Sequence, residues 1–432
     1  MDSVKVGLIG FGTIGGGVAE ILLGKSEQIA RATGKKIELV KICDKDLTSD
    51  RGVAVPDGIL TDNLADIIDD PEISIVVELI GGIEPARTFV LRALESGKDV
   101  VTANKALIAN CGPELFAKAR ELGRAIGFEA SVCGGIPVLS SIQTSLQANT
   151  IKSIQAIVNG TCNFILSEME SKGAAYDDVL KEAQRLGFAE ADPTLDVDGS
   201  DSTQKLCILA QLAFGAVTDW KTISRVGVDV VDAIDVKFAQ KLGRRIRLLA
   251  IAERSEEGLV LKVCPTLIPE DSALAKVTNA YNGVEIVGDF VGSVFYQGWG
   301  AGRRPTASAV CSDVIDAALG RAKITFDSLQ LWSEDRETVA VMDAKKISGR
   351  AYLRLRVEDK PGMMAKIAAI LAKRDVSIES MLQPPKTSPD EELATLIILT
   401  HEARSEALDD AVAELDAAPY IHGKTIRLAV RD

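Results

Sequence analysis

Residues 4–17 read VKVGLIGFGTIGGG, a short apolar run that leads directly into a glycine-rich turn. The run from Val4 to Ile9 suits a buried parallel strand, and the residues after the turn have helical periodicity. Gly10, Gly12 and Gly15 form a G-x-G-x-x-G pattern between strand and helix, where the backbone can approach a pyrophosphate at the helix N-terminus. Because glycine-rich turns also serve packing alone, the prediction of a dinucleotide site depends on the next strand as well.

The next strand favours a dinucleotide-binding, Rossmann-type domain. The apolar run from Ile37 to Cys43 ends at Asp44, whose carboxylate can bind a ribose 2′-OH and repel a 2′-phosphate. Asp44 therefore favours NAD, whereas the adjacent Lys45 partly neutralises the repulsion and admits NADP. We expect the chain to use both cofactors. The cofactor-binding residues predicted from this unit are Gly10, Phe11, Gly12, Thr13, Ile14, Gly15, Asp44 and Lys45.

Composition indicates a globular protein of two or three domains. The chain has 432 residues, of which 47% are hydrophobic and 26% are charged. The net charge of −13 argues against nucleic acid and anionic membranes as partners. No apolar run approaches the length of a membrane span. Seven scattered cysteines without a C-x-x-C pair indicate reduced thiols and a cytoplasmic location, with neither zinc nor disulfides implied.

Histidine is scarce, and this restricts the chemistry. The chain contains only His401 and His422, both close to its C-terminus. If that region is a separate domain, the body of the protein has no histidine. Nucleophilic schemes that need histidine, histidine-ligated zinc and histidine proton acceptors are then excluded. Any proton that moves must use lysine, a carboxylate, tyrosine or water.

An acidic segment at residues 187–205 ends in one lysine, Lys205. We predict a loop followed by a helix from Ser200 to Phe214, with Ser200 as its N-cap. Asp201 and Lys205 then share one helix face at i,i+4 spacing. Such a cluster can hold a substrate ammonium and move a proton, although a solvated acidic loop with a surface ion pair fits the spacing equally well. A calcium loop does not fit, because Lys205 falls where that loop needs a carboxylate.

Alternating strands and helices continue to about residue 135, as in a doubly wound α/β domain. The segment 102–105 follows a predicted strand directly, where ligands collect in an open parallel sheet, although Lys105 alone reads as an ordinary solvated lysine. Residues 125–129 are predicted to form another strand. From residue 151 the pattern becomes mixed, and residues 258–298 are rich in predicted strands. A helix from Thr306 to about Leu319 could pack back on the nucleotide domain.

Together these motifs resemble the homoserine dehydrogenase family. Residues 183–205 match that family's signature, and the glycine-rich N-terminus and the motifs at 102–105, 159–163 and 298–302 resemble the family in order and spacing. The resemblance covers about residues 1–325. It implies a Rossmann domain at 1–135, completed by about 303–325, and an α+β substrate-binding and dimerisation domain at 136–302.

The resemblance also implies roles for individual residues. Lys205 would donate a proton to the substrate carbonyl, and Lys105 would be a second active-site lysine near cofactor and substrate. The implied substrate-binding residues are Glu190, Asp196, Asp201, Asn159 and Thr161, and the implied additional cofactor-binding residues are Thr102, Lys105 and Gly302. A monovalent cation such as sodium would be held by Glu129 and the carbonyl groups of Val132, Gly134 and Ile136, where the alternative is a glycine-rich turn without an ion.

The C-terminal region has a different pattern. After a connector at 326–350, residues 351–432 are predicted to fold in a βαββαβ order that resembles the ACT domain, a module that commonly binds amino acids. The turn from Asp359 to Gly362 offers backbone N–H groups for an effector carboxylate, and Asp359 could take its ammonium. The resemblance implies threonine as the effector. A purely dimerising role is the alternative, and removal of residues 350–432 is expected to leave an active enzyme.

The sequence therefore predicts an NAD(P)-dependent dehydrogenase that interconverts L-aspartate 4-semialdehyde and L-homoserine, as a homodimer or homotetramer. The alternative from another class is a nicotinamide-responsive regulator that binds an amino acid without turnover. Lys205 beside Asp201 argues against that alternative, because binding alone needs no lysine there. An aspartate-semialdehyde dehydrogenase would need an activated cysteine with a histidine, which the body lacks.

Overall fold

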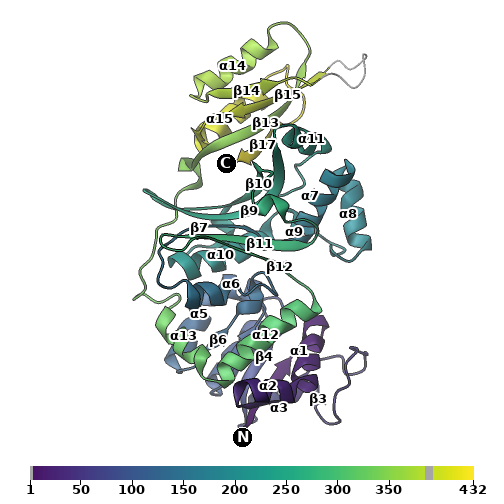
Figure 1. The fold of residues 1–432 in the computed structure, drawn as a ribbon, viewed down its shortest axis with the longest axis vertical. Helices are drawn as coiled ribbons and strands as arrows, with labels where there is room; N and C mark the ends of the chain where they lie inside the picture. Colours follow the sequence, from purple (N-terminus) through teal and green to yellow (C-terminus); the bar gives the residue numbers. More distant parts are fainter. Residues whose placement is uncertain (1–2, 385–392) are drawn as a thin grey trace.

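The computed structural model describes residues 3–384 and 393–432. Figure 1 shows an elongated molecule in three tiers: an N-terminal α/β unit, a central mixed sheet with helices beside it, and a C-terminal unit at the opposite end. Within the described ranges, no helix is both long enough and apolar enough to cross a membrane.

The N-terminal unit is built on a six-stranded parallel sheet, which confirms the predicted doubly wound fold. Its strands lie in the order β3-β2-β1-β4-β5-β6. The chain therefore turns outward in opposite directions on either side of the β1–β4 pair, and ligands bind at the carboxyl ends of strands at such a point. The strands are β1 (Ser3–Ile9), β2 (Lys36–Cys43), β3 (Leu60–Thr61), β4 (Ile73–Glu78), β5 (Asp99–Thr102) and β6 (Ile126–Gly127).

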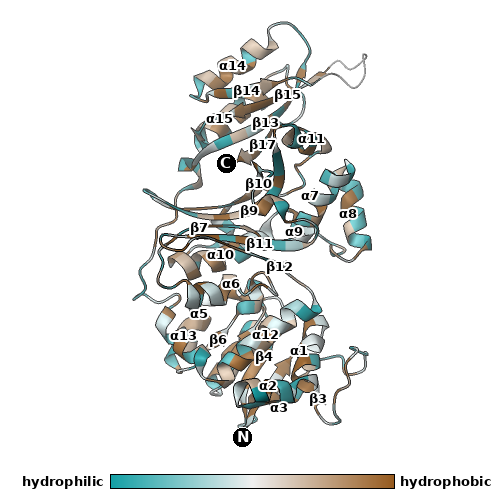
Figure 2. Ribbon diagram, viewed as in Figure 1, coloured by the Kyte–Doolittle hydropathy of each residue, from teal (hydrophilic) through white to brown (hydrophobic). Residues whose placement is uncertain are grey.

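Helices cover both faces of this sheet. Side chains of α1 and α12 share one hydrophobic core with one face, and those of α3, α4 and α5 pack on the other. The chain returns for α12 after the whole central unit, as predicted, although α12 begins at Arg303 rather than Thr306. Figure 2 shows hydrophobic residues along the strands and a largely hydrophilic α2 at the outer edge. The helices are α1 (Thr13–Gly24), α2 (Ser26–Thr33), α3 (Ala65–Ile68), α4 (Ala86–Glu95), α5 (Lys105–Glu121), α12 (Arg303–Ala318) and α13 (Arg321–Leu329).

The central unit contributes five long strands to a second, mostly antiparallel sheet. The path of this sheet is β12-β11-β7-β9-β10-β17-β13-β15-β14. The central-unit strands on it are β7 (Ile151–Ile157), β9 (Arg244–Ser255), β10 (Gly258–Pro269), β11 (Tyr281–Gly288) and β12 (Gly292–Trp299), with the short β8 (Ser224–Arg225) beside β10. The helices are α6 (Val138–Ser140), α7 (Gly160–Lys172), α8 (Tyr176–Arg185), α9 (Thr194–Val197), α10 (Ser200–Phe214) and α11 (Ala233–Lys241).

The C-terminal unit has the predicted βαββαβ order. Its elements are β13 (Ser348–Glu358), α14 (Met363–Lys373), β14 (Ile378–Leu382), β15 (Leu393–Thr400), the short β16 (Ala403–Arg404), α15 (Ser405–Asp416) and β17 (Ile426–Val430). It is not a free appendage, because β17 pairs with β10 on one side and with β13 on the other. The buried Asp235 of α11 also accepts hydrogen bonds from Tyr352 (2.8 Å) and Arg354 (2.7 Å) of β13.

Several local predictions were wrong. Ser200 is the first helical residue of α10, and the N-cap is Gly199 with φ of 84°, a left-handed conformation suited to glycine. The predicted loop before α10 contains α9. Residues 125–129 form only the two-residue β6, because Glu129 already begins a 3-10 turn. The strand β9 was not predicted at all, and α13 continues to Leu329, into the expected connector.

Candidate active site

Asp201 is the centre of the candidate site. It lies in the first turn of α10, where the left-handed Gly199 starts the helix and directs the side chain into the protein. Its residue exposure is 5%. A buried carboxylate is costly unless it is paired and hydrogen-bonded, so its partners determine what the site can do.

Two lysines from different elements pair with this carboxylate. Nζ of Lys205 lies 2.8 Å from Oδ2 of Asp201, and Nζ of Lys105 lies 2.9 Å from Oδ1. Burial alone would raise the pKa of Asp201, but Lys205 and Lys105 overcome that effect and hold the pKa well below its usual range. The charge of Asp201 in turn raises the pKa of Lys105. The site therefore holds one carboxylate anion shared by two ammonium groups.

The first turn of α5 places Lys105. Asn104 caps that helix by accepting a hydrogen bond from the Leu107 N–H at 3.0 Å, and its amide donates to the Gly82 carbonyl at 2.6 Å. Thr102, at the end of β5, accepts from the Asn104 N–H at 3.0 Å and donates to buried Glu78 at 2.7 Å. Thr102 thus supports the turn that carries Lys105, at the edge of the sheet where ligands are expected.

Asn159 connects the carboxylates of the site. It is the N-cap of α7, since its Oδ1 accepts from the Cys162 N–H at 2.8 Å. Its Nδ2 donates to Asp201 and to Asp196, both at 2.9 Å. Burial and the charge of Asp201 raise the pKa of Asp196. A cation placed beside Asp196 would be well stabilised.

These groups line one cleft with a cavity volume of about 870 Å³. The sequence-predicted residues that share it are Lys105, Asn159, Thr161, Glu190, Asp196, Asp201, Lys205 and Gly302. The hydroxyl of Thr161 donates to the Phe188 carbonyl at 2.6 Å, which leaves its oxygen as the free acceptor. Glu190 is exposed at the rim of the cleft, close enough for its charge to raise the pKa of Lys105. The cleft therefore has an acidic wall facing two amines.

Two features of the cleft were missed by sequence reasoning. The Val158 carbonyl accepts a 2.7 Å hydrogen bond from Nζ of Lys205, so the lysine is fixed by a backbone group as well as by Asp201. Asn282 of β11 also lines the cleft and is 1% exposed. No motif marks either residue; an asparagine inside a predicted strand region, at 258–298, is the one signal that could have drawn attention to Asn282.

The glycine-rich turn has the shape that a bound dinucleotide requires. A Cβ on Gly15 would lie 2.1 Å from the Gly10 carbonyl oxygen, so only glycine fits there, whereas a Cβ on Gly12 would meet no atom within 4 Å. No side chain caps the start of α1, which leaves its N–H groups available to an anion. The carboxylate of Asp44 accepts from the Phe11 N–H at 2.5 Å and from the Asp46 N–H at 2.9 Å, so it is fixed beside the turn.

Thr13 and Ile14 begin α1, whereas Lys45 follows Asp44 on the loop after β2. All three residues lie at the carboxyl edge of the sheet, with the other predicted cofactor residues. The structure thus brings the predicted nucleotide-binding residues of the first two strands to one place.

Glu129 lies in a buried turn that also contains the other predicted cation ligands. Its carboxylate accepts from the N–H groups of Leu139 (3.0 Å) and Ser140 (2.6 Å). Burial raises the pKa of Glu129 to about 7, against a lowering effect of these hydrogen bonds. In the part of the chain that the structure describes, no lysine or arginine pairs with it, and the neighbouring, half-buried Asp313 accepts from the Glu129 N–H at 2.9 Å. The turn therefore concentrates negative charge.

The three predicted carbonyl ligands follow Glu129 in the same buried segment. Val132 and Ile136 are buried, and the Ile136 carbonyl accepts from the Val138 N–H at 2.7 Å. Gly134 has φ of 44°, and a Cβ there would lie 2.5 Å from the Gly300 carbonyl oxygen, next to the candidate active site. This set of oxygen atoms suits a hard cation rather than a thiophilic metal.

The predicted effector turn lies far from this cleft, at the start of α14. Asp359 and Gly362 line a hollow of about 360 Å³ that also includes Gln383 and Met364. Gly362 has φ of 86° and is the N-cap of α14. The structure therefore places both residues at one hollow on the C-terminal unit.

Comparison with known families accounts for almost the whole chain. Models described as "Homoserine dehydrogenase, NAD binding domain", "Homoserine dehydrogenase" and "ACT domain" match residues 10–129, 137–315 and 351–419. The homoserine dehydrogenase of Pseudomonas aeruginosa is 43% identical over 435 residues, which covers 100% of this chain and 99% of that protein. The homoserine dehydrogenase of Neisseria gonorrhoeae is 41% identical, with 96% of each chain covered.

Solved structures agree with these relatives. A homoserine dehydrogenase from Thiobacillus denitrificans has a TM-score of 0.92 at 43% identity and covers 100% of this chain, as this chain covers 99% of it. A hyperthermophilic archaeal homoserine dehydrogenase, solved in complex with NADPH, has a TM-score of 0.63 at 30% identity over 74% of this chain and 98% of that one.

Proposed function

Because the chain belongs to the homoserine dehydrogenase family and is an NAD(P)-dependent oxidoreductase acting between L-aspartate 4-semialdehyde and L-homoserine, we propose that Lys205 is its proton donor and acceptor. One observation carries this assignment: the Lys205 ammonium is held by the Asp201 carboxylate and the Val158 carbonyl at the wall of the cleft. The lack of histidine in the body of the chain leaves lysine, a carboxylate, tyrosine or water for this role, and Lys205 is the lysine fixed in place at the cleft. The non-catalytic alternative, a nicotinamide-responsive regulator, is not supported by the comparisons.

The reaction needs one hydride and one proton in the direction of aldehyde reduction. When bound, the nicotinamide supplies the hydride to the aldehyde carbon. The Lys205 ammonium, or a water that it orders, gives its proton to the carbonyl oxygen, which becomes the hydroxyl of homoserine. Asp201 holds the Lys205 amine in position before the transfer by accepting its hydrogen bond. In the oxidation direction Lys205 takes the hydroxyl proton back, and Lys105 keeps Asp201 ionised throughout.

The acidic wall explains selectivity for an amino acid. Asp196 and Glu190 would bind the substrate ammonium, a charge-assisted contact that also lowers the raised pKa of Asp196. The Thr161 hydroxyl and the Asn159 amide would position the substrate. Lys105 would lie between substrate and cofactor, where its ammonium can hold the substrate carboxylate.

The cofactor would lie across the carboxyl edge of the parallel sheet. The α1 N-terminus with Gly10, Gly12 and Gly15 fits a pyrophosphate, and Asp44 would bind the ribose, with Lys45 permitting NADP as well. Thr102 and Gly302 would line the path toward the cleft. The uncapped helix start and the fit of Gly15 to the turn support this assignment.

A monovalent cation such as sodium would be held by Glu129 and the carbonyl groups of Val132, Gly134 and Ile136. The support is the lack of a basic partner for Glu129 among the described residues, together with the adjacent carboxyl of Asp313. A cation there would let Glu129 ionise and would stiffen the turn that abuts Gly300 at the cleft.

Regulation and assembly complete the proposal. Threonine would bind at the hollow formed by Asp359 and Gly362, and the chain would act in the cytoplasm as a homodimer or homotetramer. The edge strand β12 supports the assembly, because Trp299 is 45% exposed and the adjoining turn exposes Phe290 by 88%. The division into domains at 1–135 with 303–325, 136–302, 326–350 and 351–432 is part of the same proposal.

Steady-state assays test the proposed cofactor use and the proposed threonine effector directly. Initial rates would be measured with homoserine and with NAD or NADP, each with and without threonine. We expect turnover with both cofactors and inhibition by threonine. Turnover that is unaffected by threonine and the other aspartate-derived amino acids would overturn the effector assignment and leave the C-terminal unit an assembly element.

A further inference from the structure

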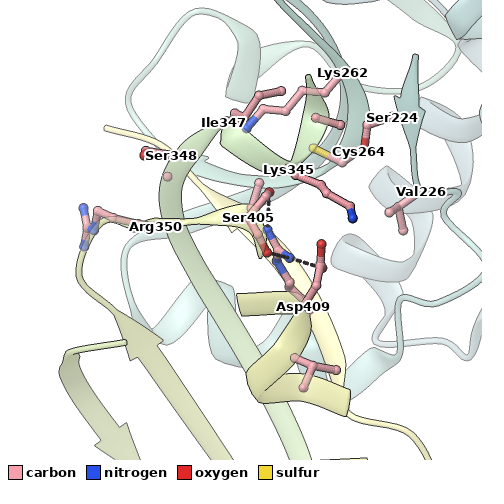
Figure 3. A pocket seen from close by; sticks show the side chains of 15 residues that line it. Ser224, Val226, Lys262, Cys264, Lys345, Ile347, Ser348, Arg350, Ser405 and Asp409 are labelled. Atoms are coloured by element: carbon pink, nitrogen blue, oxygen red, sulfur yellow. Dashed lines mark hydrogen bonds and ion pairs between the residues drawn. The ribbon is translucent and has the colours of Figure 1, made fainter. Parts of the chain in front are cut away.

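A second polar cavity lies where the central sheet, the connector and the C-terminal unit meet. Its volume is about 300 Å³, at the lower end of the range for small-molecule sites. Strands β8 and β10 form one wall, the 3-10 turn Ala344–Lys346 a second, and α15 with β17 a third (Figure 3). It is separate from the cleft of Asp201 and from the hollow at Asp359, with which it shares no lining residue.

The cavity has a marked excess of positive charge. Four of its lining residues are basic, Lys262, Lys345, Arg350 and Arg427, and one, Asp409, is acidic. Asp409 and Ser405 already engage Arg427, whose Nη2 lies 2.9 Å from the Ser405 hydroxyl. Arg350 likewise pairs with Glu379 and Asp432.

The two lysines differ from the arginines. Throughout residues 3–384 and 393–432, neither the Lys262 nor the Lys345 ammonium group has an ion-pair or hydrogen-bond partner. Figure 3 shows the Lys345 amine pointing into the hollow between Val226 and Asp409, and the Lys262 side chain crossing the other side toward Ile347. Two amines from different elements thus line one cavity, whose one acidic lining residue, Asp409, is already paired with Arg427.

The wall at β8 leads directly to the loop that carries the active-site carboxylates. The N–H of Val226 donates to the Val263 carbonyl at 2.8 Å, and two residues later the N–H of Val228 donates to the Val197 carbonyl of α9 at 2.8 Å. A Cβ on the intervening Gly227 would lie 2.2 Å from that same carbonyl oxygen. Because the backbone is this closely packed, we expect a shift at Val226 to displace α9, which includes Asp196.

We propose that this cavity binds a small anion with carboxylate or phosphate groups through Lys262 and Lys345. A bound anion would join the connector to β10 and so brace the C-terminal unit against the central sheet. Through residues 226–228 it would also change the position of the loop between Asp196 and Asp201. This site is independent of the proposed threonine site, because it uses a different face of the C-terminal unit.

Calorimetric titration of the full-length protein tests the site. NAD would be present to fill the nucleotide site, and ionic strength would be held constant with chloride, because surface ion pairs are screened by salt. Succinate and inorganic phosphate are the two probes, used separately to distinguish a carboxylate ligand from a phosphate ligand. The test variant is the double substitution Lys262→Met and Lys345→Met, which removes both charges and keeps the side-chain stems. Lys237→Met, at an exposed position of α11, is the matched control.

We expect saturable binding of one anion per chain, weakened about tenfold or more in the double variant and unchanged in Lys237→Met. The KM for aspartate 4-semialdehyde should change about fivefold on anion addition in the wild type and in the control, and not in the double variant. If the anion instead changed KM by competing with substrate in the active-site cleft, the effect would persist in the double variant. The double variant therefore distinguishes competition from binding at the second cavity. The absence of saturable binding, or equal binding by wild type and double variant, would overturn the site. An unchanged KM in a wild-type enzyme that binds the anion would overturn the coupling.

Discussion

Nζ of Lys205 lies 2.8 Å from Oδ2 of Asp201, one turn earlier on the same helix, inside a wall that excludes most solvent. The i,i+4 spacing alone would give an exposed ion pair worth a few tenths of a kcal/mol. Burial makes this ion pair more important, because a buried carboxylate stays ionised only while its partners remain. Asp201 is therefore expected to fix the positions of both lysines and to control the charge of Lys105.

The first prediction concerns this control. Asp201→Asn keeps the shape of the side chain and removes its charge, so the pKa of Lys105, raised in the wild type mainly by Asp201, should fall. In the direction of aldehyde reduction, the variant should lose about 10²-fold or more in kcat/KM. The high-pH limb of its kcat/KM profile should also move to lower pH, because Lys105 loses its ammonium form at a lower pH than in the wild type. Asp178→Asn, at an exposed position of α8, is the control and should retain the wild-type profile. A high-pH limb that does not move would contradict the role of Asp201.

Cofactor preference is the second prediction. Asp44 is fixed beside the glycine-rich turn by the Phe11 and Asp46 N–H groups, in position to repel a 2′-phosphate. Asp44→Ala should raise the ratio of kcat/KM for NADP to that for NAD by about tenfold, the size of one lost charge-assisted contact. Parallel assays with the two cofactors measure the ratio. An unchanged ratio would mean that this carboxylate does not face the ribose.

The third prediction concerns the cation and pH. Burial raises the pKa of Glu129 from its usual 4.5 to about 7, so the native state holds this proton more tightly than the unfolded chain does. Stability from this group is therefore present below about pH 4.5 and is lost as the pH rises to about 7. In sodium-free buffer the loss should be of the order of ~3 kcal/mol, from 1.36 kcal/mol per pKa unit.

Sodium should restore this stability at pH 8 and have little effect at pH 5, because only the ionised carboxylate needs a counter-charge. Denaturant titrations at both pH values measure it. The same measurements on Glu129→Gln, which is neutral at every pH at this position, are the control. Subtracting its sodium effect from that of the wild type removes the contribution of Asp313. Equal sodium effects in the wild type and in Glu129→Gln would exclude this turn as the cation site.

Regulation gives the fourth prediction. Deleting residues 350–432 is a poor test, because it would remove β17 from the edge of β10 and leave the buried Asp235 without Tyr352 and Arg354. Such a deletion should destabilise the central sheet, contrary to the expectation from sequence. Asp359→Ala keeps these contacts and should raise the threonine concentration for half-inhibition by about tenfold, as expected for a lost contact to a charged group. Unchanged inhibition with unchanged basal kcat would place the effector elsewhere.

Much of the fold and part of the site could be predicted from sequence because the signals are local. The β1–turn–α1 unit lies in consecutive residues, and Asp201 and Lys205 are four positions apart on one helix. Lys105 pairs with Asp201 across 96 positions, and no pattern in either segment specifies that contact. The family resemblance, not the spacing, brought Lys105 into the predicted site.

The strand β9 shows why a central element was missed. It reads RRIRLLAIAERS, with charged residues at both ends. Arg247 within it is 0% exposed, because its guanidinium donates to the carbonyls of Ala275 (2.7 Å) and Val277 (3.2 Å). In the sequence this arginine interrupts the apolar pattern expected of a buried strand, because the distant carbonyls that accept its hydrogen bonds cannot be identified there. The pairing of β17 with β10 was equally hidden, since the sequence does not reveal which strands of the central and C-terminal units pair.

The most direct test of the central claim is kcat of Lys205→Ala in both reaction directions, with Lys237→Ala, at an exposed position of α11, as the matched control. If Lys205 moves the proton, kcat should fall by at least ~10²-fold, the lower end for a general acid–base residue, while cofactor affinity stays near wild type. The control should keep wild-type kcat. A Lys205→Ala enzyme that is folded, binds cofactor and retains more than about half of wild-type kcat, far above the loss expected of a general acid, would contradict the mechanism.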